Sequence, residues 1–314
     1  MALLEANVER MMHRKTQLLQ FSKINDFCFA EVTIASELDQ VTGSFKFRAA
    51  YNVVSSIQAP GFLAASSGNF GQALAKACQQ LGRSCVVVMP TTSAKVKIAA
   101  VQSFGATVDL VDTALKSRAT RVAELAEQHP DFHVASAYDC PYVIEGNASL
   151  GQELAPLAQN KDLILAPIGG GGLSSGVISG LCSMSVTTPV WGAEPTLGDD
   201  ACRSLESGHL LRNPSEPQTI ADGARTVSLG VRNWEIISTS MKQALRVSED
   251  NIRRALALYA QCDLRVEPTG ALTLGALLEH PKLFEHRKVI IIISGGNVDQ
   301  DVWEEQVTRG RALL

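Results

Sequence analysis

Lys46 stands out as a candidate nucleophile, because it lies where a glycine-containing segment meets a helical pattern. The segment is TGSFK at residues 42–46, and the residues after it have helical spacing. A helix N-terminus disfavours a cation, so this placement predicts a lowered pKa and a free amine able to attack a carbonyl group. Phe45 and Phe47 flank the lysine and argue against full exposure. A solvated surface lysine is the alternative interpretation.

A second segment, SSGNFG at residues 66–71, could bind an anion. Its small residues leave the N-terminus of the following helical pattern open, so backbone N–H groups there can meet a carboxylate. Ser67 and Asn69 would place a hydroxyl and an amide group beside that carboxylate. A plain capped loop explains the same residues equally well.

A third segment consists of four consecutive glycines at residues 169–172, after an apolar run at residues 163–166. Such a run lets several backbone N–H groups converge on a phosphate. The segment lacks both the GxGxxG fingerprint with its acid and the Lys-Ser/Thr pair of a P-loop. A small phosphorylated ligand is therefore favoured over a nucleotide, and a flexible turn is the alternative.

The fourth segment, SGGN at residues 294–297, follows the apolar run at residues 289–293. A hydroxyl at the carboxyl end of a parallel strand lies where open α/β sheets bind ligands. Taken together, the four segments supply a nucleophilic lysine, an anion loop, a phosphate loop and a strand-end hydroxyl. This combination indicates a phosphorylated aldehyde cofactor held by the lysine, with an amino-acid carboxylate bound beside it.

The elements that must position these segments alternate between strand and helix patterns. Helical patterns at residues 93–104 and 114–128 separate short apolar runs, which predicts βαβ units and a mainly parallel sheet. The polar loop at residues 208–219, with two prolines, is expected to be a surface excursion. The predicted strands are residues 85–89, 107–111, 132–136, 163–166, 190–193 and 289–293.

Composition excludes several classes of function. The 314 residues carry a net charge of −4 without a basic cluster, and aromatics make up only 5%, which argues against nucleic-acid and anionic-membrane binding. The longest apolar run is too short to span a bilayer, and residues 1–15 do not read as a secretory signal, so a cytoplasmic location is expected. The seven cysteines lack CxxC spacing, which favours buried thiols over a zinc site or disulfides.

Seven motifs carry a resemblance to one known family, in family order and over about residues 15–300. They are TGSFK, SSGN, GGGG, AEP, ADGxR, EPTGA and SGGN. The sequence resembles the pyridoxal-phosphate enzymes of the tryptophan-synthase-β-like fold (fold type II), and among them the serine/threonine dehydratase and serine racemase family. The resemblance implies an α/β fold with two intertwined parallel-sheet domains and the cofactor, pyridoxal 5'-phosphate, between them. It implies a large domain of residues 1–49 plus 141–314, a small domain of residues 50–140, and a homodimer.

The resemblance also implies roles for matched residues. Lys46 would form a Schiff base with the cofactor and later exchange protons at the substrate Cα. Asn69 would contact the ring hydroxyl, and Ser294 the pyridine nitrogen. Ser67 would face the cofactor opposite Lys46, where racemases of this family have their second base. The remaining implied cofactor contacts are Phe45, Gly169, Gly170, Gly171, Gly172, Leu173 and Gly223, and those to the substrate carboxylate are Ser66, Ser67, Gly68 and Asn69.

A divalent cation is implied as well. In the racemase-like branch a glutamate, a backbone carbonyl four residues on and an acid two residues further bind a metal. These positions are Glu194, Gly198 and Asp200 here. Oxygen ligands suit Mg²⁺ or Ca²⁺. An acidic surface loop is the alternative interpretation.

The activity expected from the resemblance is that of an ammonia-lyase, or dehydratase. Its substrate would be a small β-hydroxy amino acid such as L-serine, L-threonine or 3-hydroxyaspartate, converted to a 2-oxo acid and ammonia. The alternative is an amino-acid racemase with Lys46 and Ser67 as opposed bases. Phe70 replaces the usual histidine after SSGN, which indicates a reshaped pocket. Arg225 could meet a second substrate carboxylate or form a structural salt bridge.

Overall fold

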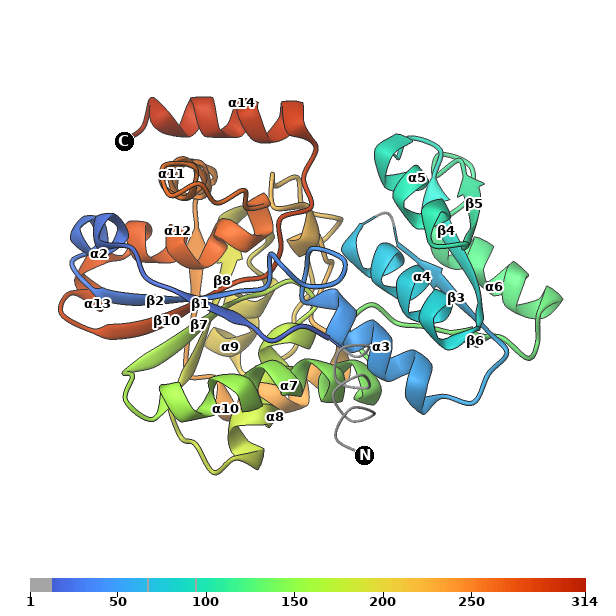
Figure 1. Cartoon of the computed structure of the whole chain (residues 1–314), viewed down its shortest axis with the longest axis horizontal. Helices are drawn as coiled ribbons and strands as arrows, with labels where there is room; N and C mark the ends of the chain where they lie inside the picture. The colour runs from blue at the N-terminus through green and yellow to red at the C-terminus, as the bar shows by residue number, and fades with distance from the viewer. Residues whose placement is uncertain (1–12, 67, 94) are drawn as a thin grey trace, which may run out of the picture.

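Two β-sheets, connected by helices, organise the chain in the computed structural model, which describes residues 13–66, 68–93 and 95–314 (Figure 1). The larger sheet has the strand order β1-β2-β10-β7-β8-β9, and the smaller one β5-β4-β3-β6. Among the described strands every pairing is parallel except that of β1 with β2. The strands are β1 Gln17–Leu19, β2 Glu31–Ser36, β3 Gly61–Ala65, β4 Ser84–Pro90, β5 Thr107–Val111, β6 His133–Val134, β7 Leu163–Pro167, β8 Val190–Pro195, β9 Ala244–Val247 and β10 Lys288–Ile293.

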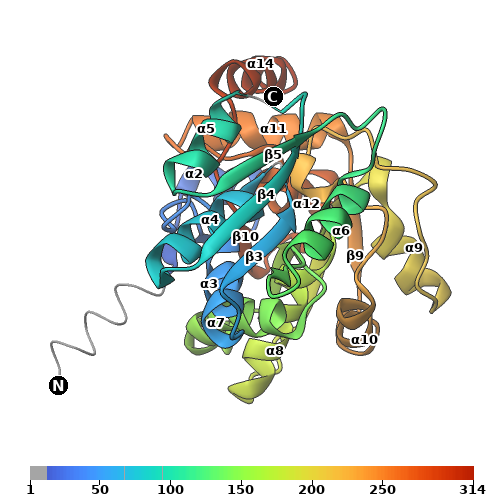
Figure 2. The same ribbon diagram turned by 90° about the vertical axis from the view of Figure 1, so that its right-hand side faces the viewer.

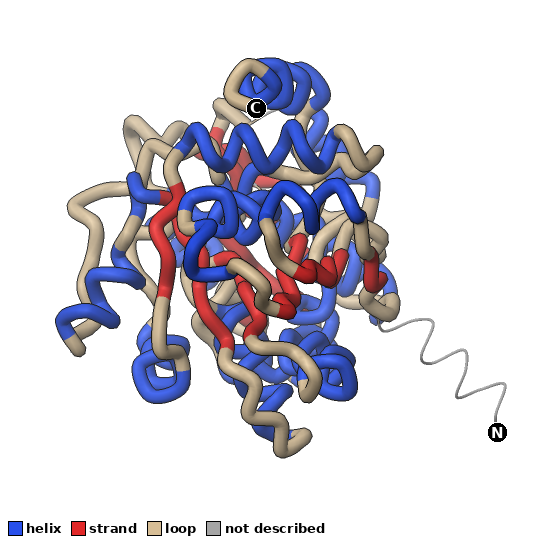
Figure 3. The backbone as a smooth tube through the Cα atoms, turned by 90° about the vertical axis from the view of Figure 1, so that its left-hand side faces the viewer, coloured by secondary structure: helices blue, strands red, loops and turns tan. Residues whose placement is uncertain are grey.

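Helices cover both faces of the larger sheet, which explains why its central strands are apolar throughout (Figure 3). In β10, Ile291 and Ile293 pack into the core on one face, and Ile290 and Ile292 into the core on the other. The first face carries α2 Ser22–Cys28, α11 Glu249–Ala260, α12 Leu272–Glu279, α13 Pro281–Phe284 and α14 Gln300–Arg311, and the second α7 Pro141–Ala158, α8 Gly172–Ser183, α9 Asp200–Ser207 and α10 Val231–Ser240.

The smaller sheet has its own core (Figure 2). One face packs against α3 Lys46–Ser56, α4 Asn69–Leu81 and α5 Lys95–Ser103. The other face packs against α6 Arg118–Gln128. Short 3₁₀ turns complete the chain, η1 Thr196–Gly198, η2 Asp222–Ala224 and η3 Pro268–Ala271. No helix in the described part of the chain is long and apolar enough to cross a membrane.

The predicted α/β architecture with two mainly parallel sheets is confirmed, but the predicted strands do not include β1, β2, β3 and β9, and several other elements begin or end at different residues. The helix predicted from residue 114 begins at Arg118, because the Ser117 hydroxyl caps it by accepting from the Thr120 backbone N–H at 3.0 Å. The strand predicted at residues 132–136 has only two residues, His133–Val134. The domain boundaries at residues 50 and 140 stay a prediction.

A buried ionic cluster ties the lysine-bearing helix to the larger sheet. The Arg48 side chain is fully buried two residues after Lys46. Its Nε donates to a Glu37 carboxylate oxygen at 2.7 Å, and its Nη1 to Glu153 at 2.8 Å. Its Nη2 donates to the Thr16 hydroxyl at 2.8 Å. Because a buried charge is tolerated only when it is paired and hydrogen-bonded, these four residues must stay together in the folded protein.

Replacing this guanidinium should destabilise the fold strongly. Arg48→Met leaves the buried Glu37 carboxylate without its cation, so we expect the free energy of unfolding to fall by about 3–5 kcal/mol. Urea unfolding followed by tryptophan fluorescence measures the effect. The matched control is Arg309→Met, which removes an exposed pair with Glu305 on α14 and should change the unfolding midpoint little. Equal midpoints for both variants would contradict this account.

Candidate active site

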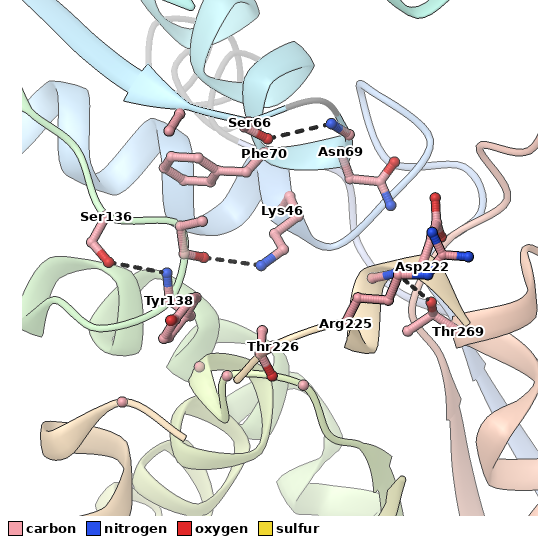
Figure 4. A pocket seen from close by; sticks show the side chains of 18 of the residues that line it. Lys46, Ser66, Asn69, Phe70, Ser136, Tyr138, Asp222, Arg225, Thr226 and Thr269 are labelled. Atoms are coloured by element: carbon pink, nitrogen blue, oxygen red, sulfur yellow. Dashed lines mark hydrogen bonds between the residues drawn. The ribbon is translucent and has the colours of Figure 1, made fainter. Parts of the chain in front are cut away.

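A cavity of about 970 Å³ is lined by residues of both sheets, and all four glycine-rich segments meet in it (Figure 4). Residues of the smaller sheet and its helices contribute one wall, and the loops after β7 and β10 contribute another. The polar loop 208–219 reaches it too, through Arg212 and Glu216. Most residues of this loop are exposed, as expected of a surface excursion, but Asn213 and Thr219 within it are buried.

Lys46 is the first residue of α3 and lines this cavity, as predicted. Its Nζ donates to the Ala137 carbonyl at 2.9 Å and lies 4.9 Å from the centre of the Phe45 ring. Burial lowers the pKa of Lys46 to about 8, and the nearby Glu267 carboxylate opposes this shift. The predicted direction of the shift is confirmed, but its main cause is desolvation rather than the helix dipole.

The lysine loop is fixed to the end of β10 by backbone contacts. The Phe45 N–H donates to the Ser294 carbonyl at 2.9 Å, and the Gly296 N–H to the Gly43 carbonyl at 3.0 Å. Gly43 has a φ of +68°, and a Cβ there would lie 2.5 Å from the Asn297 side chain. This close approach brings Lys46 and Ser294 into one cavity.

Ser294 carries an unpaired polar atom in the place where the sequence predicts a cofactor contact. Its side chain is buried, and its Oγ has no hydrogen-bond partner in the described part of the chain. Buried hydroxyls are rarely left unpaired, because the loss of hydration is costly. A ligand with a ring nitrogen at this point would supply the missing partner, so Ser294 fits the expected cofactor.

The four-glycine segment forms the turn between β7 and the N-terminus of α8. Gly171 precedes the helix with a φ of +88°, which disfavours any other residue. A Cβ on Gly170 would lie 2.3 Å from the Tyr138 ring, and one on Gly169 would lie 2.7 Å from the Gly223 carbonyl oxygen. The free N–H groups at the start of this 12-residue helix fit a phosphate group.

The SSGN segment leads into α4, which begins at Asn69. The Ser66 Oγ accepts from the Gly71 N–H at 3.0 Å, so Ser66 closes the loop as the capped-loop alternative expects. Gly68 and Asn69 line the cavity, and Ser67 lies outside the described residues. Phe70, which replaces the usual histidine, lines the cavity and packs into the core of the smaller sheet.

Two ion pairs bridge the mouth of the cavity. Lys97 of α5 lies 3.2 Å from Asp222, and Arg118 of α6 lies 3.8 Å from Glu216. Arg225 donates only to the Thr219 carbonyl at 2.8 Å and makes no ion pair within the described residues. The structural salt bridge considered for Arg225 is therefore not found there. Arg212 also lines the cavity without an acidic partner among those residues.

Glu267 is a site residue that the sequence did not reveal. It precedes η3, its side chain is buried, and it lines the cavity beside Asn69 and Lys46. Burial and the neighbouring Asp222 raise the pKa of Glu267 to about 8. The only signal in the sequence was an acid within an otherwise uncharged EPTGA motif, with no indication of what it faces.

The residues expected to hold a metal lie at the end of β8 and just after it, with Glu194 in β8, Gly198 in η1 and Asp200 at the start of α9. Glu194 and Asp200 are buried, so the alternative of an acidic surface loop is wrong. Glu194 accepts from two backbone N–H groups at the start of α9, and Asp200 accepts from the Asn213 amide at 2.9 Å. Burial raises the pKa of Glu194 to about 8 and that of Asp200 to about 6. Within the described residues no group of three or more His, Cys, Asp or Glu side chains could hold a metal ion.

Known proteins are similar to this chain in both sequence and fold. Residues 10–295 match the family model described as pyridoxal-phosphate dependent enzyme. Serine racemase of Dictyostelium discoideum is 37% identical over 300 residues, which cover 93% of this chain and 92% of the relative. L-threo-3-hydroxyaspartate ammonia-lyase of a Pseudomonas species is 36% identical and covers 86% of each chain. The structure of threonine deaminase isoform 2 from Solanum lycopersicum superposes with a TM-score of 0.88 at 26% identity, covering 96% of this chain and 89% of the other.

These matches agree with the geometry of the cavity. An amine with a lowered pKa, a hydroxyl without a partner among the described residues and a glycine turn line one cavity, a combination that fits pyridoxal phosphate. The match to the family model covers most of the chain, and the relatives are aligned over nearly their whole length. The chain therefore belongs to the pyridoxal-phosphate-dependent enzyme family.

Proposed function

We propose that the protein is an ammonia-lyase that removes the β-hydroxyl of a small hydroxy amino acid and releases a 2-oxo acid and ammonia. The observation that carries the proposal is the pairing of a buried Lys46 amine with a neutral Ser294 hydroxyl in one cavity. A hydroxyl, unlike a carboxylate, leaves the ring nitrogen less protonated. That suits an elimination, which needs a carbanion only briefly.

Each site residue has a proposed task. Bound pyridoxal phosphate supplies the electron sink for the bond broken at the substrate Cα. Lys46 would hold the cofactor covalently, and its free Nζ would take the proton from the substrate Cα. Asn69 donates to the ring hydroxyl, and Ser66, Ser67, Gly68 and Asn69 hold the substrate carboxylate. Phe45 and Gly223 flank the cofactor ring, and the N–H groups of Gly169, Gly170, Gly171, Gly172 and Leu173 hold the phosphate.

A substrate with a second carboxylate, such as 3-hydroxyaspartate, is favoured by the charges of the cavity. Arg212 and Arg225 line it without acidic partners among the described residues. Guanidinium groups bind carboxylates well. The Pseudomonas relative, named for hydroxyaspartate, supports the same choice.

An amino-acid racemase is the second candidate, because a relative with 37% identity is named serine racemase. Racemisation needs a base on each face of the substrate Cα. Lys46 would serve one face and Ser67 the other. Both reactions start with the same proton transfer to Lys46, so one protein can catalyse both.

We further propose that Glu194, Asp200 and the Gly198 carbonyl bind Mg²⁺ or Ca²⁺. The support is two buried carboxylates with raised pKa values, which a cation would compensate. The ion would stabilise the loop rather than take part in the reaction. A homodimer is proposed from the family resemblance, and a cytoplasmic location from the seven free cysteine thiols.

Lys46 should be reactive at a lower pH than other lysines. Because its pKa is lowered to about 8, the neutral amine forms as the pH rises through 8 rather than through the ordinary value of 10.5. We expect covalent attachment of pyridoxal phosphate to the cofactor-free protein to accelerate across pH 7–9 and then level off, as followed by absorbance. Lys46→Ala should abolish attachment, and the exposed Lys242→Ala should not. A midpoint near pH 10 would contradict the buried amine.

The reaction itself can be followed by proton NMR in heavy water with the cofactor-loaded protein. Both enantiomers of serine, threonine and 3-hydroxyaspartate are supplied separately, and a 2-oxo acid should form fastest from hydroxyaspartate. Arg225→Met should weaken hydroxyaspartate turnover about tenfold or more and leave serine turnover nearly unchanged, because only the former has a second carboxylate. Formation of the opposite enantiomer without 2-oxo acid, lost in Ser67→Ala, would replace the lyase by the racemase.

Cation binding should appear as thermal stabilisation. A cation that binds only the folded state at 100 times its dissociation constant adds about 2.7 kcal/mol. We expect millimolar MgCl₂ or CaCl₂ to raise the melting temperature of the wild type, and Asp200→Asn to lose this increase. Sodium chloride at equal ionic strength is the control. If sodium chloride shifts the melting temperature as much as the divalent chlorides do, and equally in the wild type and in Asp200→Asn, there is no specific cation site.

A further inference from the structure

The Glu267 carboxylate is buried in the wall of the cavity and forms no ion pair within the described residues. Its two oxygens accept from one donor, the Asn69 Nδ2, at 3.0 and 2.9 Å. Burying a carboxylate beside a single amide donor is costly, because a hydrogen bond to one amide offsets only part of the lost hydration. Such an arrangement is expected only where the contact has a task. The arrangement therefore points to a task for Glu267 that involves Asn69.

The hydrogen bonds around Asn69 allow only one orientation of its carboxamide. The Asn297 Nδ2 donates to the Thr42 carbonyl at 2.7 Å and to the Asn69 Oδ1 at 2.9 Å. If the Asn69 amide were turned over, its oxygen would face the Glu267 carboxylate and its NH₂ would face the NH₂ of Asn297. The contact between the two NH₂ groups would be repulsive whether or not Glu267 is protonated. Glu267 thus binds the NH₂ group of the Asn69 carboxamide, and Asn297 binds its oxygen.

These hydrogen bonds of Asn69 connect the parts of the chain that belong to the two sheets. Asn69 begins α4, which packs on the smaller sheet, whereas Asn297 follows β10 of the larger sheet. The Glu267 backbone N–H also donates to the Gly295 carbonyl at 3.1 Å, next to Ser294. The amide is therefore placed relative to Ser294 and Lys46 by residues of the larger sheet, not by its own helix alone.

We propose that Glu267 is a positioning residue that fixes the Asn69 carboxamide against the ring hydroxyl of the cofactor. The inference rests on the proposed pyridoxal-phosphate lyase, in which Asn69 contacts that hydroxyl. Glu267 accepts from one N–H of the Asn69 NH₂ group and leaves the other N–H directed into the cavity. It acts on the cofactor through Asn69 and does not itself exchange protons with the substrate.

The charge of Glu267 has a second effect, on Lys46. The groups whose charges bear on it are Lys46 of α3, Lys97 of α5 and Asp222 of η2. The carboxylate raises the pKa of Lys46 and so partly opposes the burial that lowers it. Removing the charge should therefore make Lys46 neutral at a still lower pH. A residue that only packed into the wall would not have this effect.

The test uses Glu267→Gln, which keeps the shape and removes the charge. In the cofactor-free protein, trace labelling of Lys46 with acetic anhydride and mass spectrometry gives the pH midpoint of its reactivity. We expect the midpoint to fall by about one unit. The dissociation constant of pyridoxal phosphate, from absorbance titration, should rise about tenfold. The matched control is Glu279→Gln, a carboxylate remote from the cavity that also accepts from an asparagine amide, Asn251, and it should change neither quantity.

A double-mutant cycle asks whether Glu267 acts through Asn69. Asn69→Ala should weaken cofactor binding, and adding Glu267→Gln should weaken it no further. Asn297→Ala, which releases the other end of the amide, should weaken binding and leave the Lys46 midpoint in place. Additive effects in the cycle, or an unchanged midpoint in Glu267→Gln, would overturn the proposal. If Glu267→Gln does not fold, as judged by circular dichroism, the same cycle is run with Glu267→Asp, which draws the carboxylate back from the Asn69 amide.

Neither readout requires turnover, so the two levels of inference fail separately. A wild-type protein that does not bind pyridoxal phosphate contradicts the proposed function. A wild type that binds it, together with a Glu267→Gln variant of equal affinity and equal Lys46 midpoint, contradicts only the role of Glu267.

Discussion

The active cavity depends on one backbone contact, the attachment of the lysine loop to the end of β10. The Phe45 N–H binds the Ser294 carbonyl, and the Gly43 carbonyl binds the Gly296 N–H. These bonds place an amine and a hydroxyl, 248 residues apart in the sequence, in the same cavity. Glycine at position 43 is required for this approach, since any side chain there would meet Asn297. Every other feature of the site is arranged around this attachment.

The electrostatic balance of the cavity follows from burial. Desolvation lowers the pKa of Lys46 to about 8, and the buried Glu267 carboxylate limits the size of this shift. The helix N-terminus behind Gly171 provides partial positive charge for a phosphate without a basic side chain. Arg212 and Arg225, which line the cavity and make no ion pair within the described residues, are available for the solvent-facing end of a ligand.

The sequence could predict the fold and half of the site because those features are local. Apolar runs bounded by glycine or proline indicate strands such as β10. The four consecutive glycines at residues 169–172 indicate a phosphate-binding turn without reference to any other segment. The rest depends on contacts between distant segments. Neither the bond from Asn69 to Glu267 nor the entry of the 208–219 loop into the cavity has a local signal. For Lys46, the helix start was visible in the sequence, but the burial that governs its pKa was not.

Helix α3 has an additional mechanical meaning. Its residues Phe47 and Val53 belong to the core of the smaller sheet, yet Arg48 is bonded to Glu37 and Glu153 beside the larger sheet. Helix α3 is therefore anchored to both sheets, and Lys46 is its first residue. Any displacement of Lys46 along or across this helix would therefore disturb the packing around both sheets at once.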